Sequence, residues 1–493
     1  EQIFEKNYLK DEEELKKGIF GMPRNIIIYS KEIDELLRKV KIADPACGSG
    51  AFPLGILNEI VRARNILTFY INMIEVLKEK DEKNYWSRLE KKQRSRTPYK
   101  LKLYAIQNSL YGVDIEPSAI DITKLRLWLS ILVDSTNNDV RPLPNLDFNF
   151  MIGNSLIDEF EGMKLFDESL LDDKVLEKKV KETEKVKYNK LFQGFEDKQQ
   201  NILKEIFTKQ SLFFNENNSH KKKELKNDIE SLENNLIELT LNESGNHKKL
   251  EEIEKGRKER RKPYFLWKLE FAKVFKENGG FDIVIGNPPY GAKYDNQTKR
   301  YYKNTYVTAN SIRGLQKGSL DTYTLFIELG YNLLRRNGSF AYIVPISLTS
   351  SDSLTGVHRL LMNNCDTIHI SSYSVRPKPV FENAVVNTSI LLFQKTETPC
   401  QHLYSTKMHR RGNELDLQKL IDNLNFSNVY GYTMIGRIPK IGCEMEKDIL
   451  IKIFDNTPIR TLYDDKGDPI YYRTTGGRYF KVVTNYPTDS TKE

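Results

Sequence analysis

Between positions 41 and 133, short continuous apolar runs typical of buried strands alternate with apolar residues spaced as on one face of a helix. A short run at Lys41–Ala43 predicts a buried strand, and the apolar residues of Pro53–Leu67 recur at the spacing of one helix face. A second strand is predicted at Ser109–Asp114 and a second helix at Ser118–Val133. The side chains expected to pack that helix onto a sheet are Ile122, Leu125, Leu129 and Leu132. Strand, glycine turn, helix, strand and helix predict a doubly wound, Rossmann-like α/β sheet.

The α/β pattern resumes after residue 280. Phe281–Ile285 predicts a buried strand that runs into the sequence GNPPY. An amphipathic helix is predicted at Thr322–Arg335, and a turn at Arg336–Gly338 leads into a strand at Ser339–Val344. These elements belong to the same predicted sheet as the first ones.

A charged stretch separates the two halves of this pattern. Roughly half of the residues from Asn215 to Lys262 are charged, which is typical of a solvated helical excursion. Spacings of four and three predict a short coiled-coil seam made of Leu225, Ile229, Leu232, Leu236 and Leu239. We expect the turn Asn242–His247 to reverse the chain into a second helix containing Leu250 and Ile253. The stretch is predicted to be a helical hairpin that buries its own seam.

These patterns divide the chain into five parts. The first is a helical segment, in which Pro23 predicts a turn ahead of a helix at Glu32–Val40. The parts are residues 1–40, the helical segment; 41–157, the first half of the α/β domain; 158–262, the charged insert; 263–395, the second half; and 396–493, a small mixed domain.

Composition narrows the class of protein. The 493 residues exceed one ordinary domain, and 76 basic against 68 acidic side chains give a net charge of +8, which mildly favours a polyanionic partner. No apolar run is long enough to cross a membrane, and the four cysteines form no CxxC pair, so we expect a cytoplasmic protein without a zinc ribbon, metal site or disulfide framework. Because the chain begins at Glu1, we expect it to be a piece of something longer.

The glycine turn DPACGSGAF follows the first strand. Gly48 and Gly50 let the backbone turn tightly and approach a ligand, and the free N–H groups at the next helix start favour a carboxylate or phosphate. On its own the turn is equally well a structural feature. Cys47 has no histidine nearby in sequence to activate it, so a packing role is favoured over a nucleophile.

Two further motifs carry chemistry. Asp114 ends the second strand, where an acid can accept both hydroxyls of a ribose, although it could equally be a helix N-terminal carboxylate. In GNPPY, the Asn287 side-chain oxygen and the Pro288 carbonyl can each accept one N–H bond from an exocyclic amine. Tyr290 can stack on the ring that bears the amine. A plain proline turn is the alternative.

DPACGSGAF, GVDIEPSAI and GNPPY, in this order, resemble motifs I, II and IV of the gamma-group DNA adenine N6-methyltransferases. The sequences FLWKLEFAKVF, DTYTLFIELGYNLLRRNGSFAYIVPIS and RPKPVFENAVVNTSILLF more closely resemble the methyltransferase region of type IIG restriction-modification enzymes. The resemblance covers about residues 20–395 outside the insert. It implies a bacterial enzyme with a Rossmann-like methyltransferase sheet, S-adenosylmethionine as cofactor and double-stranded DNA as partner.

The resemblance also implies site residues. Cofactor contacts fall on Asp44, Ala46, Gly48, Gly50, Asp114, Ile115, Asn154 and Phe326. Catalytic positions fall on Asn287, Pro288 and Tyr290, and the pair that stacks on the flipped target base falls on Tyr290 and Phe381. The chain departs from the family at Met22-Pro23, where a Thr-Pro pair is usual, so the methionine-end contact of this segment is not implied.

The resemblance further implies that target choice lies after the catalytic half, so residues 396–493 are expected to begin a target-recognition domain. Tyr471–Lys481 combines basic, aromatic and glycine residues and suits either a DNA-contacting loop or a β-hairpin with exposed arginines. The alternatives for the whole chain are a protein or RNA methyltransferase that uses the same NPPY turn, and a non-catalytic DNA-binding subunit. Any nuclease domain is expected to lie outside residues 1–493; no oligomeric state follows from the sequence.

Overall fold

The computed structural model describes the chain in two compact units. The first unit comprises residues 1–344, 353–366 and 391–399, and the second comprises 345–352, 367–390 and 400–493. The described residues are 22–78, 87, 91, 96–134, 146–160, 163–165, 190–216, 218–243, 253, 255–256, 262–310, 320–381, 385–412, 416–433, 437–455, 471–473 and 480–482. Within them, no helix combines the length and apolarity that a membrane span requires.

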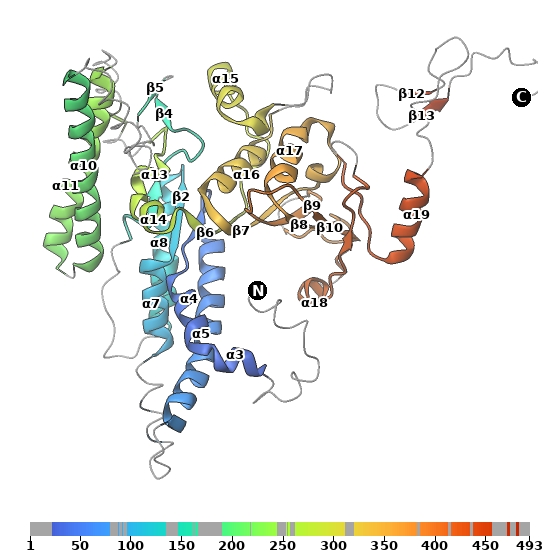
Figure 1. Cartoon of the computed structure of the whole chain (residues 1–493), viewed down its shortest axis with the longest axis horizontal. Helices are drawn as coiled ribbons and strands as arrows, with labels where there is room; N and C mark the ends of the chain where they lie inside the picture. The colour runs from blue at the N-terminus through green and yellow to red at the C-terminus, as the bar shows by residue number, and fades with distance from the viewer. Residues whose placement is uncertain are drawn as a thin grey trace, which may run out of the picture. The chain divides into compact units, whose positions relative to one another are not determined.

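A parallel sheet organises the first unit (Figure 1). Its strands are β1 (Ile42–Asp44), β2 (Leu110–Asp114), β3 (Phe150–Ile152), β6 (Phe281–Gly286) and β7 (Leu334–Pro345), in the order β7-β6-β1-β2-β3. Strand β1 pairs in parallel with β2 on one side and β6 on the other. The chain therefore reverses its direction of winding at β1, and ligands bind at the carboxyl edge of such a switch point. The predicted doubly wound sheet is confirmed.

Helices pack against this sheet. They include α5 (Ala51–Lys78), α7 (Pro98–Asn108), α8 (Pro117–Leu132), α14 (Ala272–Asn278) and α16 (Thr322–Leu333). Helix α5 runs well beyond the predicted end at Leu67, and its first half contributes Leu57, Ile60 and Val61 to the core. The predicted turn after α16 exists as an irregularity inside β7, where the pairing with β6 jumps from Leu334 to Ser339.

The predicted core face of α8 is wrong. Ile122, Leu125 and Leu129 are 44%, 48% and 47% exposed. The face that packs on the sheet instead carries Ile120, Thr123, Leu127 and Ile131. Apolar residues lie on more than one side of this helix, so periodicity alone cannot select the buried side.

The helical insert also differs from its prediction. Helix α11 (Ser219–Glu243) pairs with the preceding α10 (Lys190–Asn215); these are the two long green helices of Figure 1. Lys209 and Asp228 join the two across the hairpin at 2.8 Å. Their apolar residues share one cluster with Phe148, Tyr264 and Leu266 of the α/β domain. The insert is therefore part of the core, because its seam does not close on itself. Ile253 belongs to the same cluster, whereas Leu250 lies outside the described residues.

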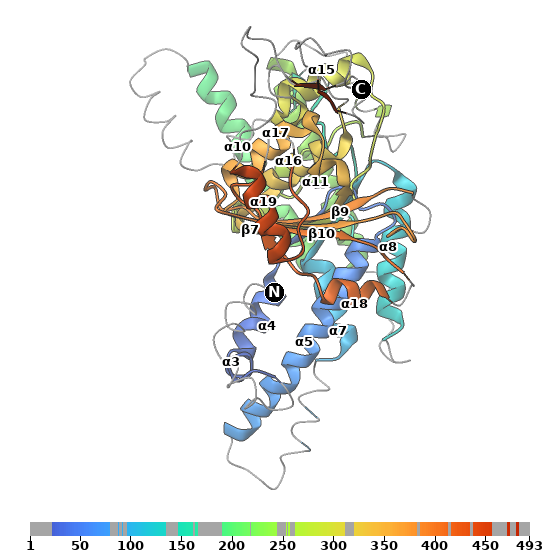
Figure 2. The same cartoon turned by 90° about the vertical axis from the view of Figure 1, so that its right-hand side faces the viewer.

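The N-terminal segment packs on α5. Its helices are α3 (Arg24–Ile28) and α4 (Ser30–Lys39), seen in Figure 2 beside the long blue α5. Asp34 of α4 is buried and accepts hydrogen bonds from Arg64 at 2.9 Å and Arg96 at 2.6 Å. Met22 packs into the apolar clusters between these helices.

The second unit holds β8 (Thr367–Tyr373), β10 (His402–His409), β11 (Ser427–Asn428), α18 (Asp416–Asp422) and α19 (Glu444–Phe454). Strand β10 pairs in parallel with β8, so residues on both sides of the predicted boundary at 396 belong together. Strand β9 (Thr388–Gln394) begins in this unit and ends in the first. Near the C-terminus, β12 (Tyr471–Arg473) pairs antiparallel with β13 (Phe480–Val482), as the hairpin alternative predicted.

The remaining described elements are short. They are β4 (Glu159–Phe160), β5 (Met163–Lys164), α13 (Trp267–Glu270), α15 (Asn296–Thr305), α17 (Thr355–Asn364), and the 3-10 turns η2 (Val307–Ala309), η3 (Ile346–Thr349) and η4 (Asp352–Leu354).

Candidate functional site

Three loops meet at the carboxyl edge of the first unit's sheet. They follow β1, β2 and β6, which are adjacent strands. The register places Asp44 beside Gly112, and a Cβ at Gly286 would lie 2.7 Å from the Asp44 carboxylate. The structure therefore brings the predicted residues of β1, β2 and the β6 turn to one edge of the sheet.

The turn after β1 is held by hydrogen bonds that its backbone N–H groups donate to residues of β2. The Gly48 N–H donates to Asp114 Oδ2 at 2.8 Å, and the Cys47 N–H donates to the Val113 carbonyl at 3.1 Å. Gly50 has φ +81°, and a Cβ there would meet Thr123 at 2.8 Å. A Cβ at Gly48 would meet nothing within 4 Å, so this glycine faces open space. The turn is fixed in shape and leaves room for a ligand at Gly48.

Cys47 is buried beneath the turn. Burial raises the pKa of its thiol well above the usual value, with the carboxylates of Asp44 and Asp114 adding to the effect. A thiol that resists ionisation is a poor nucleophile. This agrees with the packing role predicted for Cys47.

Asp44 is a buried acid without a cationic partner among the described residues. Its carboxylate accepts the Ala46 N–H at 3.1 Å. Burial, opposed by that hydrogen bond and aided by the negative charge of Asp114, raises the pKa of Asp44 to about 8. A positive group of a ligand placed beside Asp44 would favour the ionised carboxylate.

Asp114 serves the turn and the next helix at once. Its Oδ2 accepts the Gly48 N–H, and its Oδ1 accepts the Glu116 N–H at 2.9 Å, just ahead of α8. The helix-start alternative is therefore also present in the structure. Each carboxylate oxygen keeps a second lone pair for a ligand hydroxyl. Ile115 beside it is 64% exposed and offers an apolar surface at the edge of the site.

A fourth loop, after β3, docks on the first. Asn154 accepts the Leu156 N–H on its side-chain oxygen at 3.2 Å, and its own N–H donates to the Lys262 carbonyl at 3.1 Å. The Ser155 hydroxyl donates to the Pro45 carbonyl at 2.7 Å. These bonds hold Asn154 against the turn of Asp44. Phe326, by contrast, lies in α16 and is only 6% exposed, so any ligand contact is restricted to a small part of its ring.

The NPPY turn begins where β6 ends. Asn287 is half-buried, Pro288 is buried, and Pro289 is exposed. The Tyr290 hydroxyl donates to Asn287 Oδ1 and lies 3.1 Å from the Ile343 carbonyl. Burial raises the pKa of Tyr290 to about 12, so its proton remains available for donation at neutral pH. Tyr290 therefore orients the Asn287 side-chain oxygen, a contact that the sequence did not reveal.

Sequence reasoning missed a group of residues that position the NPPY turn. Asp321 and Thr322, at the start of α16, accept the Gly291 and Ala292 N–H groups, each at 3.1 Å. The Tyr294 hydroxyl adds a 2.8 Å bond to Thr322. The pair Asp321-Thr322 resembles a helix cap, but the Asp321 side chain makes no cap bond to its own helix. The sequence signal for the pair was therefore misleading about its partner.

A tyrosine of α15, Tyr301, and the residue that follows the helix, Tyr306, join this region to the loop after β3. The Tyr301 hydroxyl donates to Asp158 at 2.6 Å, and the Tyr306 hydroxyl donates to the Leu156 carbonyl at 2.9 Å. No motif predicted these contacts, because the paired residues are some 150 positions apart.

Phe381, the second predicted stacking residue, lies in the other unit. It is half-buried, and residues 382–384 lie outside the described residues. The pairing of Phe381 with Tyr290 stays a prediction. The Met22-Pro23 segment packs on α5, where Met22 contacts apolar residues.

Known proteins resemble the chain over much of its length. The family described as Eco57I restriction-modification methylase matches residues 108–381, more than half of the chain. The Methanocaldococcus jannaschii protein RM.MjaORFECS2P, a candidate type II restriction enzyme and methyltransferase, is 27% identical over 74% of this chain and 30% of its own length. The chain thus spans less than a third of that relative.

Two shorter matches are of the same kind. The Escherichia coli type II restriction enzyme and methyltransferase RM.Eco57I is 28% identical over 26% of this chain and 13% of its own length. The Thermus thermophilus type II methyltransferase M.TthHB8I is 37% identical over 15% of this chain and 17% of its own. Among solved structures, the DrdV–DNA complex aligns with 82% of this chain and 30% of that one, at 13% identity and a TM-score of 0.40.

Proposed function

The chain belongs to the Eco57I restriction-modification methylase family, and from that premise we propose that it methylates the N6 amino group of adenine in double-stranded DNA, using S-adenosylmethionine. The observation that carries the proposal is the convergence of Asp44, Asp114 and Asn287 at one edge of the sheet. The first two suit a charged nucleoside cofactor, and the third suits a planar amine. Adenine specificity, the cofactor and DNA as the partner are all part of this proposal.

The residues present fit the cofactor. The Asp44 carboxyl is buried and has a pKa of about 8, so a positive charge beside it would stabilise its ionised form. S-adenosylmethionine carries two such charges, on its sulfonium and its amino group. Asp114 keeps lone pairs for ribose hydroxyls, and Gly48 faces open space. When bound, the cofactor supplies an electrophilic methyl group. The other predicted contacts are Ala46, Gly50, Ile115, Asn154 and Phe326.

The NPPY turn fits the target base. The Asn287 side-chain oxygen and the Pro288 carbonyl would accept the two N6–H bonds of adenine, which localises the amino lone pair and aims it toward the cofactor site. Tyr290 would stack on the base, for about 1–3 kcal/mol. Because the amino group is out of reach inside a duplex, the base must leave the stack, which costs a few kcal/mol.

The Tyr290 hydroxyl adds a condition to this scheme. It donates to the same Asn287 oxygen that the adenine amine needs. An amide oxygen has two lone pairs, so one can bind Tyr290 while the other binds the base. The hydroxyl would then hold the amide in the orientation that leaves the second lone pair toward the base.

The proposal is tested by incubating the purified chain with a mixed-sequence plasmid and methyl-labelled S-adenosylmethionine, then mapping every modified base. We expect N6-methyladenine at one short sequence, and at most about one per cent of the parental label with Asn287→Ala. Label on cytosine, or label only on added RNA or protein, would overturn the assignment. We also expect the plasmid to stay uncut in Mg²⁺, because a nuclease centre needs clustered carboxylates to hold its cation and the NPPY turn has none.

A further inference from the structure

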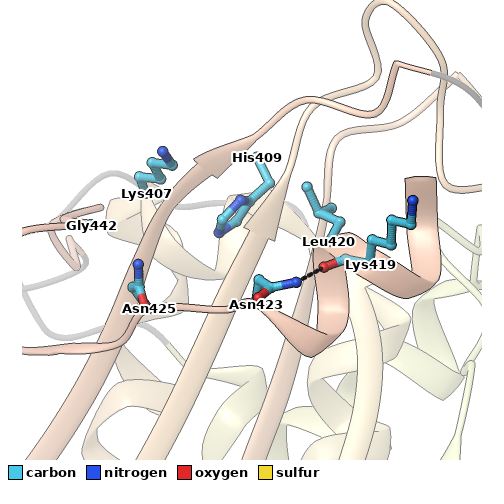
Figure 3. Close-up of a pocket in the computed structure, with 7 residues that line it drawn as sticks. All are labelled: Lys407, His409, Lys419, Leu420, Asn423, Asn425 and Gly442. Carbon is cyan, nitrogen blue, oxygen red and sulfur yellow. Dashed lines mark hydrogen bonds between the residues drawn. The ribbon is translucent and has the colours of Figure 1, made fainter.

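A pocket of about 370 Å³ opens on the second unit (Figure 3). Strand β10 supplies Lys407 and His409, and α18 with the turn after it supplies Lys419 and Asn423. Asn425 and Gly442 complete the polar part of the wall. The pocket has no place in the proposed transfer reaction, so its chemistry needs its own explanation.

His409 forms the buried part of this pocket. It is 7% exposed, and its Nε2 has no hydrogen-bond partner in the described part of the chain. In Figure 3 the imidazole lies among Lys407, Asn423 and Asn425. A buried polar atom without a partner is destabilising unless something else satisfies it. The ring is therefore a candidate for contact with a polar ligand.

The side chains around the histidine select the sign of that ligand. Lys407 and Lys419 are exposed at the rim and carry positive charge. No carboxylate lines the pocket among the described residues, and the neighbouring Glu446 accepts the Gly442 N–H at 2.7 Å. Two ammonium groups without an acid repel a cation and attract an anion.

The donors also suit one anion in particular. An imidazole N–H, lysine ammonium groups and asparagine amides are all donors to phosphate oxygens. Asn423 already donates one N–H to the Lys419 carbonyl at 2.7 Å, and its amide nitrogen carries a second N–H. Burial and the charge of Lys407 lower the pKa of His409, which favours the neutral ring, and a neutral imidazole has one N–H to donate.

We propose that this pocket holds a phosphodiester of the DNA backbone, with Lys407 and Lys419 neutralising its charge and His409 donating to one of its oxygens. The volume exceeds that of a phosphate alone and leaves room for the adjoining sugars. The assignment rests on the proposed function, because it makes DNA the source of the phosphate. It gives the second unit a role in orienting the duplex, since phosphate contacts set position without reading sequence.

The test is the salt dependence of DNA binding by the full chain. The double substitution Lys407→Ala with Lys419→Ala is compared with the double substitution Lys447→Ala with Lys452→Ala, which removes the same charge from α19 of the same unit. Losing one phosphate contact should reduce the slope of log K against log salt by about 1. We expect that reduction, and an affinity about tenfold lower at low salt, only in the pocket variant.

The outcomes separate three possibilities. If the parent methylates DNA and both variants keep its slope, the pocket assignment is overturned while the proposed function stands. If the parent neither binds nor methylates DNA, both fall together. Titration with inorganic phosphate tests the other source of the same anion: binding that the pocket variant loses, with an unchanged DNA slope, would show a free-anion site and overturn the DNA assignment.

A second measurement covers the histidine itself. The imidazole proton resonances of His409 should shift when a short duplex of any sequence is added to the parent and should not shift in the pocket variant. An equal shift of these resonances in the pocket variant would mean that the response of His409 to DNA does not depend on Lys407 and Lys419. That result would contradict the proposal.

Discussion

The turns after β1 and β6 begin on neighbouring strands, yet they are held by different means. Backbone N–H groups that bond to Asp114 and to the strand below fix the glycine turn. Side chains from α16, together with the hydroxyl of Tyr290, fix the NPPY turn. In both turns a backbone N–H donates to a carboxylate, that of Asp114 or that of Asp321. The glycine turn adds a bond to a backbone carbonyl of the strand below, whereas the NPPY turn adds bonds made by side-chain hydroxyls. We expect substitutions to separate the two turns into a binding function and a transfer function.

The largest effect is expected from Asn287→Ala. Loss of the amide oxygen removes one of two acceptors that act on the adenine amine, and turnover should fall about a hundredfold to a thousandfold. Cofactor affinity, measured by calorimetry, should stay nearly unchanged. Asn296→Ala, on the exposed start of α15, is the matched control and should keep parental turnover. If the Asn287→Ala variant kept more than a few per cent of the parental turnover, the catalytic role proposed for Asn287 would be contradicted.

Asp114→Ala should have the next largest effect, on cofactor binding. Charge-assisted hydrogen bonds contribute roughly 1.5–3 kcal/mol, so affinity should fall by about 10- to 100-fold. Asp121→Ala, on the exposed side of α8, changes the same residue type without touching the turn. A folded Asp114→Ala protein with parental affinity in calorimetry would contradict the ribose assignment and leave only the helix-start role.

Tyr290 allows the stacking and hydrogen-bonding roles to be separated. Tyr290→Phe keeps the ring and loses the bonds to Asn287 and Ile343. Because only the bond to Asn287 orients the reacting amide, turnover should fall by about two- to tenfold, the equivalent of one neutral hydrogen bond. Tyr290→Ala also loses the stacking and should be worse by a further 1–3 kcal/mol, about fivefold or more. Equal rates for the two variants would show that the hydroxyl alone matters.

The pH dependence set by Asp44 is a separate effect, because it acts on the free energy of unfolding and not on turnover or affinity. Its folded-state pKa is about 8, against 3.8 in the unfolded chain, so between these values the folded protein holds a proton that the unfolded chain has released. The free energy of unfolding should therefore fall as pH rises from about 4 to about 8. Asp44→Asn should flatten this dependence in urea unfolding.

Cofactor binding provides a second test of the Asp44 ionisation, through the proton released when the cofactor binds. A positive group beside Asp44 favours the ionised form, so binding near pH 7 should release up to one proton. Calorimetry in two buffers with different ionisation enthalpies measures that proton. Equal apparent enthalpies in both buffers for the parent protein would mean that Asp44 does not meet the cofactor's charge.

Several parts of this site follow from consecutive residues. Glycines after a short apolar run and prolines after another predicted both turns, and the acid at the end of β2 lies where expected. The strand order of a doubly wound sheet then places these turns at one edge. Local backbone chemistry is sufficient here, because glycine and proline act on their own dihedral angles.

The packing of α11 and of α8 could not be predicted from the sequence, because the residues that these helices contact are distant along the chain. Helix α11 carries the predicted seam, but the seam packs on α10 and on Tyr264 and Leu266, so the insert is not an independent hairpin. Helix α8 has apolar residues on several sides, and the sheet selects the side with Leu127. The spacing of apolar residues within each helix predicts neither the partner of the α11 seam nor the buried side of α8.

The sequence by itself determined the strands, both turns and the identity of the residues that end them, because each is fixed by its immediate neighbours. Only the tertiary structure decided the electrostatics and the orientation of those residues. Asp44 has a pKa near 8 because burial strips its carboxylate of water, and the Asn287 oxygen is oriented because a hydroxyl from the far side of the turn reaches it. Solvation and hydrogen-bond geometry depend on everything that surrounds an atom, and that surrounding exists only once the chain is folded.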